Sequence, residues 1–136
     1  MKINAQVSVE YMLVMGFAAL MTVPLLLIYY TYSSDSSDSV ATGQAIQIAR
    51  RIVDSSESVY YLGKPSQTTL KLNFPDRISS ANLSNREVIF QIKTKNGITD
   101  IVEVSSVNIS GILPTTQGIH ILTIKAEDGY VQVTSK

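Results

Sequence analysis

Few side chains in this sequence could carry out catalytic chemistry. Its 136 residues include one histidine, His120, and no cysteine, which excludes disulfides, thiolate metal sites and cysteine nucleophiles. With no second histidine to complete a site, His120 is expected to be an ordinary surface residue in a strand. Asp35 and Asp38 stand among serines, but their stretch lacks the glycine and final glutamate of a calcium-binding loop. We therefore expect a protein that is not an enzyme and needs no metal or cofactor.

Glu10 is the acidic residue with the most unusual surroundings. It stands near the start of an apolar run, residues 6–32, and the next charged side chain after it is Asp35. As a helix, this run is long enough to cross the roughly 30 Å hydrocarbon core of a membrane. A carboxylate in such a segment is costly unless an opposite charge pairs with it, so Glu10 is a candidate for an assembly contact. The alternative is a position at the headgroup level, where Glu10 interacts with the helix dipole.

The N-terminus does not follow the pattern of an ordinary secretory signal. Such a signal has an apolar region of about 7–15 residues, followed at once by a small-x-small cleavage site. Here the apolar run is longer, and the nearest such site, Ser39 to Ala41, lies well beyond its end. A cut before the run is the alternative, and it would keep the apolar helix in the mature protein.

The chain enters the apolar run through Gln6, Val7, Ser8, Val9, Glu10 and Tyr11, which follow Asn4 and Ala5. This start resembles the Q-x-S-x-E-Y start of archaeal type IV pilins that carry a class III signal peptide. The resemblance implies that a prepilin peptidase cuts between Ala5 and Gln6 and removes a leader, residues 1–5. It further implies a structural subunit with self-association, an assembly platform and the membrane as its partners.

In such a subunit, removal of the leader would leave a free amine on Gln6. A filament that buries this amine needs a counter-ion, and Glu10 of a neighbouring helix can supply it, which would set the stagger between subunits. Lys2 and the initial amine of the short leader favour a membrane precursor with its N-terminus inside. The resemblance implies that this precursor then enters a helical, adhesive, extracellular filament. A monomeric membrane-anchored adhesin or ligand-binding protein is the alternative. A role of the filament in motility also stays open, although this start favours pili.

The helix is expected to extend beyond its apolar part. Pro24 removes one intrahelical hydrogen bond, which predicts a kink. Residues 33–39, SSDSSDS, are poor helix formers and are either a break or a polar part of one long helix. Apolar residues recur at helical spacing from Ala41 to Tyr60, which favours one helix. We predict a helix over about residues 6–62, with residues 33–62 as its amphipathic continuation.

The remaining chain, residues 66–136, is expected to form a small antiparallel β domain. Predicted strands cover residues 69–74, 87–94, 99–105, 107–110, 119–125 and 130–134. Asn96 with Gly97, and Asp128 with Gly129, are typical of hairpin turns. A meander of five or six strands would bury one face against the amphipathic half of the helix. The predicted fold is therefore α+β, and this architecture is similar to that of type IV pilins.

Charge and glycosylation motifs bear on the partners of this domain. Eleven basic and eleven acidic residues leave no basic field, so nucleic-acid binding is not expected. Asn82 and Asn108 each begin an N-x-S sequon and are candidates for N-glycosylation. Archaeal pilins are often N-glycosylated, so the resemblance favours these sites, and Asn82 more because it lies in a predicted loop.

Overall fold

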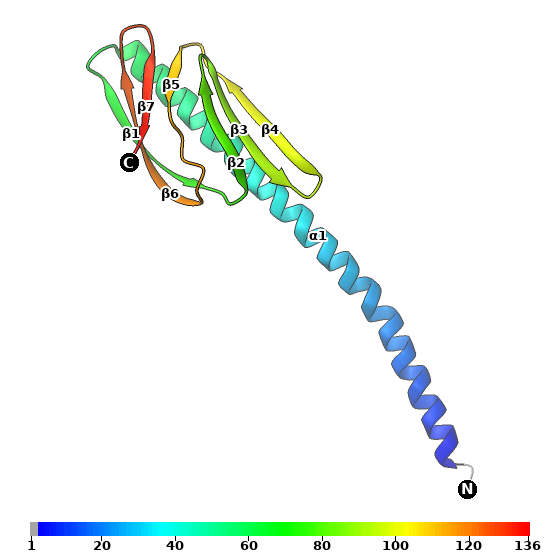
Figure 1. The fold of residues 1–136 in the computed structure, drawn as a ribbon. Coiled ribbons are helices and arrows are strands. Elements are labelled where there is room, and N and C mark those ends of the chain that lie inside the picture. The colour runs from blue at the N-terminus through cyan, green and yellow to red at the C-terminus, as the bar shows by residue number, and fades with distance from the viewer. Residues whose placement is uncertain (1–2) are drawn as a thin grey trace. The chain divides into compact units, whose positions relative to one another are not determined.

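The computed structural model describes the backbone of residues 3–136 and the side chains of residues 8–33 and 35–136. One long helix, α1 (Ile3–Leu62), is followed by seven strands (Figure 1). This confirms the predicted α+β class with an apolar N-terminal helix. The chain divides into two compact units, Met1–Ser37 and Asp38–Lys136, which are taken in turn.

The first unit consists of the apolar part of α1. The helix begins at Ile3, includes Pro24, and continues through the serine-rich residues 33–39, so the favoured interpretation as one helix is confirmed. The hydroxyl of Thr31 donates a hydrogen bond to the carbonyl of Leu27 at 3.0 Å, which satisfies this polar group inside an apolar segment. The kink at Pro24 stays a prediction.

The second unit begins with the amphipathic part of α1. The residues of this part that are buried are Ala41, Ala45, Ile48, Ala49, Ile52, Val53, Ser56 and Val59. They recur every three or four positions and so form one face of the helix. The predicted core face is therefore confirmed. Because half of its members are alanine or serine, the strands can approach the helix closely there.

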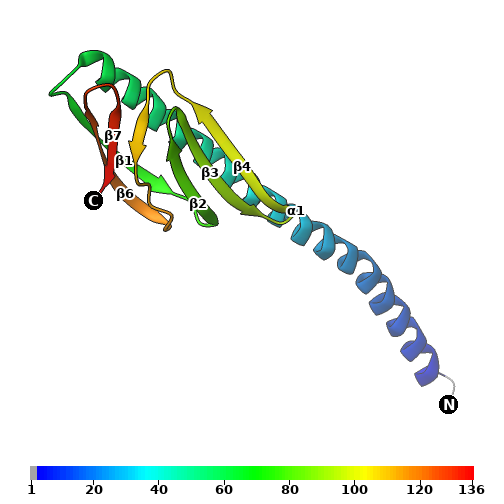
Figure 2. The same cartoon turned by 45° about the horizontal axis from the view of Figure 1, so that its top comes forward.

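Seven strands form two sheets along this part of α1 (Figures 1 and 2). Their bounds are β1 (Gln67–Phe74), β2 (Ile78–Ser84), β3 (Glu87–Thr94), β4 (Gly97–Val104), β5 (Ile109–Gly111), β6 (Gly118–Ala126) and β7 (Val131–Ser135). One sheet has the order β1-β6-β7-β5, and the other has the order β2-β3-β4. The hairpin turns predicted at Gly97 and Gly129 are confirmed, since each joins two neighbouring antiparallel strands.

The single antiparallel meander that we predicted is wrong in three respects. The strands form two sheets, β5 pairs with β7 in parallel, and β2 is a strand where none was expected. The sequence of β2 is rich in serine, asparagine and alanine, which have low strand propensity, so its pattern did not predict a strand. It forms a strand because it pairs with β3, whose own strand pattern is strong. The parallel pair arises because β5 has no adjacent hairpin partner and instead lies beside the last strand of the chain.

The two sheets form one continuous layer over the helix. Ile109 at the start of β5 donates its backbone N–H to the carbonyl of Asn85 at 2.5 Å, which joins the end of β2 to the neighbouring sheet. The rings of Phe74 and Phe90, one from each sheet, meet edge to face, with centroids 5.9 Å apart. One hydrophobic core therefore unites both sheets with α1, and β1 and β4 are left as the outer edges of the layer.

Gly111 occupies the tightest backbone contact in the layer. Its φ is +148°, and a Cβ atom there would lie 1.9 Å from the carbonyl oxygen of Val133 on β7. A side chain would have to push the two parallel strands apart. The short strand β5 therefore depends on glycine at this position.

We predict that Gly111→Ala lowers the free energy of unfolding by at least about 2 kcal/mol, because the new methyl group overlaps backbone atoms. Gly43→Ala is the matched control. Gly43 lies in the helix, and a Cβ atom added to it would meet no atom within 4 Å, so this alanine should stabilise by about 0.5–1 kcal/mol. Urea unfolding of the full chain in detergent measures both variants. Equal effects of the two alanines would contradict the close contact at Gly111.

Candidate functional site

The described residues of the first unit present an apolar surface on all sides of the helix. We call the side chains of residues 8–32 the apolar surface of α1. Its large exposed members are Val9, Tyr11, Met12, Leu13, Val14, Met15, Phe17, Leu20, Met21, Val23, Leu25, Leu26, Leu27, Ile28, Tyr29, Tyr30 and Tyr32. The helix is long and apolar enough to cross a membrane. A helix that is apolar all round needs lipid or other helices on every side.

Glu10 is the one acidic side chain within this surface, and it is exposed. It follows Gln6 by four residues, so the two lie on one helix face about 6 Å apart along the axis. The side chains of Ala5 and Gln6, and all of Met1 and Lys2, lie outside the described residues. The predicted cleavage and the pairing of Glu10 with an amine therefore remain predictions.

Small residues and aromatic residues lie at different positions along the rest of the apolar surface. Gly16, where an added Cβ atom would meet nothing within 4 Å, lies close to Ala18 and Ala19, and all three are exposed. Small residues let a second helix approach closely. Exposed tyrosines gather at the far end, a distribution typical of the boundary between an apolar and an aqueous region.

Asp38 connects α1 to the turns of the three-stranded sheet. Its carboxylate accepts a hydrogen bond from Arg77, just before β2, and another at 2.8 Å from the backbone N–H of Lys95 in the β3–β4 turn. The sequence placed Asp38 only in a serine-rich stretch of the helix and predicted no partner for it. Its partners are 39 and 57 residues away in sequence, so no local pattern could have revealed the contact.

Glu57 holds the segment between β4 and β5 against the helix. Its Oε1 accepts hydrogen bonds from the backbone N–H of Ser106 at 2.8 Å and from the hydroxyl of Ser106 at 2.9 Å. These bonds favour the ionised carboxylate and lower the pKa of Glu57. Together with the pair between Arg50 and Glu103 at 3.0 Å, they attach β4 and the segment after it to α1.

A cluster of four charged residues joins the end of α1 to the turn between β6 and β7. Lys64 Nζ lies 2.9 Å from Glu127 and 2.7 Å from Asp128, and Lys125 Nζ lies 2.8 Å from Glu127. Hydrogen bonds from Lys125 and Lys64 lower the pKa of Glu127 to about 2, and the bonds to Asp128 and Glu127 raise the pKa of Lys64. The cluster closes the layer at the C-terminal end of the helix.

His120 lies on the inner side of its strand, where we had expected a surface residue. It is half-buried, on the same face of β6 as the buried Leu122, while Ile119 and Ile121 are exposed. Its ring meets Phe74 edge to face at 5.3 Å, and Nε2 lies 2.9 Å from the carbonyl oxygen of Thr116. Both sets of alternating residues in this strand are apolar enough to face inward, and the pairing of β6 with β1 selects the set that contains His120.

The two sequon asparagines are exposed, but they are not equivalent. Asn82 lies within β2, opposite Ile89 of β3, so its predicted position in a loop is wrong. Asn108 immediately precedes β5 and lines a surface hollow beside Asn85 and Arg86 of the β2–β3 turn. Both amides are accessible at the surface, and their glycosylation remains a prediction.

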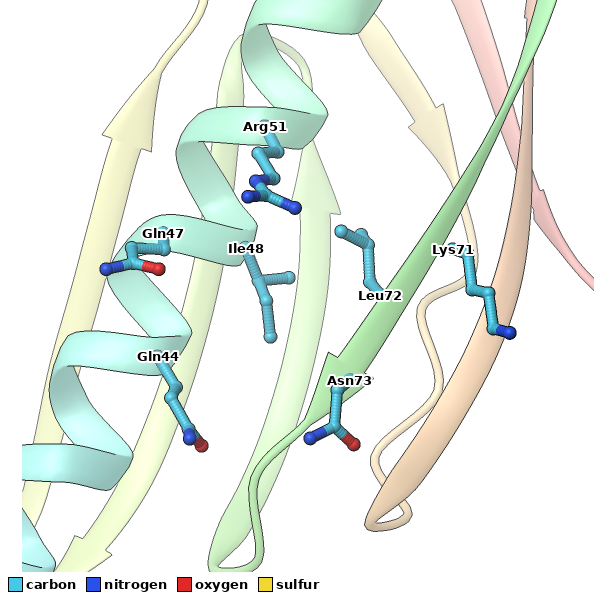
Figure 3. Close-up of a pocket in the computed structure, with 7 residues that line it drawn as sticks. All are labelled: Gln44, Gln47, Ile48, Arg51, Lys71, Leu72 and Asn73. Carbon is cyan, nitrogen blue, oxygen red and sulfur yellow. The ribbon is translucent and has the colours of Figure 1, made fainter.

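A polar groove runs between the helix and the edge strand β1 (Figure 3). We call it the α1–β1 groove, and its lining residues are Gln44, Gln47, Ile48, Arg51, Lys71, Leu72 and Asn73. Figure 3 shows Arg51 and Gln44 reaching from the helix toward β1, while Lys71 points away from the helix. Among the described residues, the guanidinium of Arg51 has no charged partner, so the groove is electropositive. Sequence reasoning missed this groove because it is formed by two elements that are distant in the chain.

The charged cluster around Glu127 predicts a specific dependence of stability on pH. The folded pKa of Glu127, about 2, lies below the value of about 4.3 that we assume for the unfolded chain. Its stabilising contribution is therefore present above about pH 4.3 and is lost as the pH falls toward 2. We expect Glu127→Gln to flatten the fall in thermal midpoint over this range, measured on the full chain in detergent.

Glu87→Gln is the control for this experiment. Glu87 lies in the same unit as the half-buried Glu127, but it is exposed and forms no ion pair within the described residues. This variant should keep the acid dependence of the parent chain. Parallel curves for Glu127→Gln and the parent would show that the cluster contributes nothing to stability.

The described residues contain no group of three or more histidine, cysteine, aspartate or glutamate side chains that could hold a metal ion. Two surfaces described above have no covering partner within the described chain, namely the apolar surface of α1 and the α1–β1 groove. Comparisons of the chain with protein-family models, with curated proteins and with solved structures find no match.

Proposed function

We propose that the chain is a structural subunit of a type IV pilus, assembled through α1 into an extracellular filament. The observation that carries this proposal is the contrast along one helix. Residues 8–32 are apolar and exposed on every side, whereas residues 41–59 are apolar on one face, which the chain's own sheets cover. The first part therefore requires partners from outside the chain. The resemblance of the start at Gln6 to the Q-x-S-x-E-Y start of type IV pilins supports further copies of the same helix as these partners.

The size of the apolar surface favours a bundle of many helices over a dimer. Burial of one large apolar side chain contributes about 1.5–3 kcal/mol, and this surface carries many such side chains around its full circumference. One neighbour can cover only one side of a helix. A membrane covers all sides, and so does a helical polymer in which each α1 is surrounded by others. The membrane then holds the subunit before assembly, and the filament core replaces it afterwards.

Glu10 favours the filament as the final location of the helix. A lipid-facing carboxylate is expensive, whereas in a helical bundle it can pair with the amine that cleavage before Gln6 would create on a neighbouring subunit. Such a pair forms only when adjacent helices have one defined axial offset. Glu10 would thus set the stagger of the polymer, while Gly16, Ala18 and Ala19 allow close packing.

The second unit, Asp38–Lys136, which we now call the outer unit, would form the surface of the filament. Its core and its peripheral ion pairs hold it together, and the chain has no cysteine for a disulfide. Both sequon asparagines are accessible on it. N-glycans at these positions would face the external medium. The prepilin peptidase and an assembly platform are the membrane partners that this function requires.

Glu10→Ala should abolish filaments while leaving the subunit in the membrane. Removal of one partner of a buried ion pair costs about 3–5 kcal/mol, which corresponds to roughly a 100- to 4000-fold loss of subunit affinity. Electron microscopy counts filaments on cells that express the variant, and immunoblots measure the membrane-bound subunit. The matched control is Glu87→Ala in the outer unit, which should assemble normally. Normal filament numbers for Glu10→Ala would contradict the proposed role of Glu10.

The N-terminus of the surface-exposed protein distinguishes the filament subunit from a membrane-anchored adhesin. We expect intact-mass and N-terminal peptide measurements on protein sheared from cells to give a chain that begins at Gln6. Ala5→Leu should block this cleavage and leave the precursor in the membrane, because a bulky side chain would occupy the cleavage site. A surface protein that retains Met1 would support the anchored adhesin instead.

A further inference from the structure

The strand β4 has the unusual property of being both an open edge and apolar on its outer face. It is the terminal strand of the β2-β3-β4 sheet, and no other described strand pairs with its free side. The side chains on its inner face have partners within the chain, since Ile101 is buried and Glu103 pairs with Arg50 of the helix. Its outer face carries Ile98, Val102 and Val104, which are 59%, 47% and 65% exposed.

Proteins usually protect an edge strand with lysine, proline, a bulge or a covering segment. β4 contains no lysine, proline or bulge, and its register with β3 is continuous over all eight of its residues. Its inward-facing charge, Glu103, is paired with Arg50 of the helix. An exposed apolar edge of this kind is a template for association with another chain. The only charged side chain among its outward-facing residues is Asp100, which lies between Ile98 and Val102 in the alternation.

The opposite edge of the layer offers a complementary surface. There the α1–β1 groove receives the guanidinium of Arg51 and has no carboxylate in its lining, while the Lys71 side chain points away from the helix at its rim. Within the described residues, neither Arg51 nor Asp100 has a charged partner of its own. The second unit thus carries an unpaired carboxylate beside apolar side chains on its edge strand β4, and an unpaired guanidinium in the groove beside its other edge strand, β1.

The groove also suits the backbone of an open strand. Gln44 and Gln47 on the helix and Asn73 on β1 carry side-chain amides, each with donors and an acceptor. The free side of β4 presents unpaired N–H and C=O groups in alternation. Amides in the groove can pair with these groups, while the alkyl stem of Arg51 offers apolar contact to the outward-facing β4 side chains.

We propose that β4 of one subunit docks in the α1–β1 groove of a second copy, with Asp100 opposite Arg51. This inference rests on the proposed filament function and names the contact between neighbouring outer units. The two surfaces differ and lie at opposite edges of the layer, so the contact is heterologous. Such a contact does not close on itself as a two-fold dimer does, and its repetition produces rings or open helical polymers.

Engineered cysteines test the contact cleanly, because the chain has no cysteine of its own. A disulfide requires Cα atoms about 5.5 Å apart, so it forms only at a true contact. We expect Val102→Cys and Gln47→Cys, combined in one full-length chain, to give a ladder of oxidised multimers in sheared filaments. The matched control combines Val102→Cys with Thr134→Cys, an exposed position on β7, and should remain monomeric on the gel.

Charge reversal tests the polar part of the same contact. Asp100→Arg should lower the cross-linking yield of the Val102–Gln47 cysteine pair by roughly two- to fivefold, as expected for an exposed ion pair, and more at low salt. Adding Arg51→Asp to that chain should restore the yield. Equal yields in all of these chains would show that Asp100 and Arg51 do not face each other.

The outcomes separate this inference from the proposed function. Filaments without a Val102–Gln47 cross-link above the Thr134 control would overturn the contact and leave the filament function standing. A chain that forms no filaments on cells but cross-links at this pair in liposomes at high density would support the contact and overturn the filament function. Cross-linking of Val102→Cys to itself, in place of Gln47→Cys, would indicate a two-fold edge-to-edge dimer and would also overturn the proposal. Absence of the Val102–Gln47 product in both filaments and liposomes would overturn it as well.

Discussion

The close packing of α1 under its own sheets is the contact on which the second unit depends. Ala41, Ala45 and Ala49 are almost completely buried, and their small side chains let the strands approach the helix backbone. Larger neighbours such as Ile52 and Phe90 then fill the space to either side. The first part of the same helix has no such cover within the described chain, although its side chains are larger and more apolar. The apolar side chains of α1 are thus covered by the chain's own strands in residues 41–59, whereas those in residues 8–32 require other molecules to cover them.

Charged contacts around this core determine where the layer is attached to the helix. Asp38 connects the helix to the β3–β4 turn, Glu57 holds the segment after β4, and Lys64 joins the end of the helix to the β6–β7 turn. Each contact is at the surface, so each contributes little free energy by itself. Their main effect is to fix where the two sheets lie along the helix, in a small domain that has no disulfide.

The two proposals follow from the same distinction between compensated and uncompensated groups. Asp38, Glu103 and Glu127 each have a charged partner. Glu10, Arg51 and Asp100 are among the charged side chains that have none within the described residues. Uncompensated charges beside apolar surface are typical of contacts that are completed by another molecule. In a helical polymer, the apolar surface of α1 would provide most of the association energy. The charged groups would provide the stagger of the helices and the orientation of the outer units.

Elements whose signals are local could be predicted from the sequence. The apolar run, the alanine-rich helix face and the hairpin turns at Gly97 and Gly129 depend on residues within a few positions of one another, so periodicity and turn chemistry revealed them. Tertiary structure alone decided the division into two sheets, the strand β2, the inward side of His120 and the partners of Asp38. Each of these depends on which distant strand becomes a neighbour, and several pairings are compatible with the same alternation of apolar residues. The α1–β1 groove belongs to this second group, because it exists only where the helix and the first strand lie side by side.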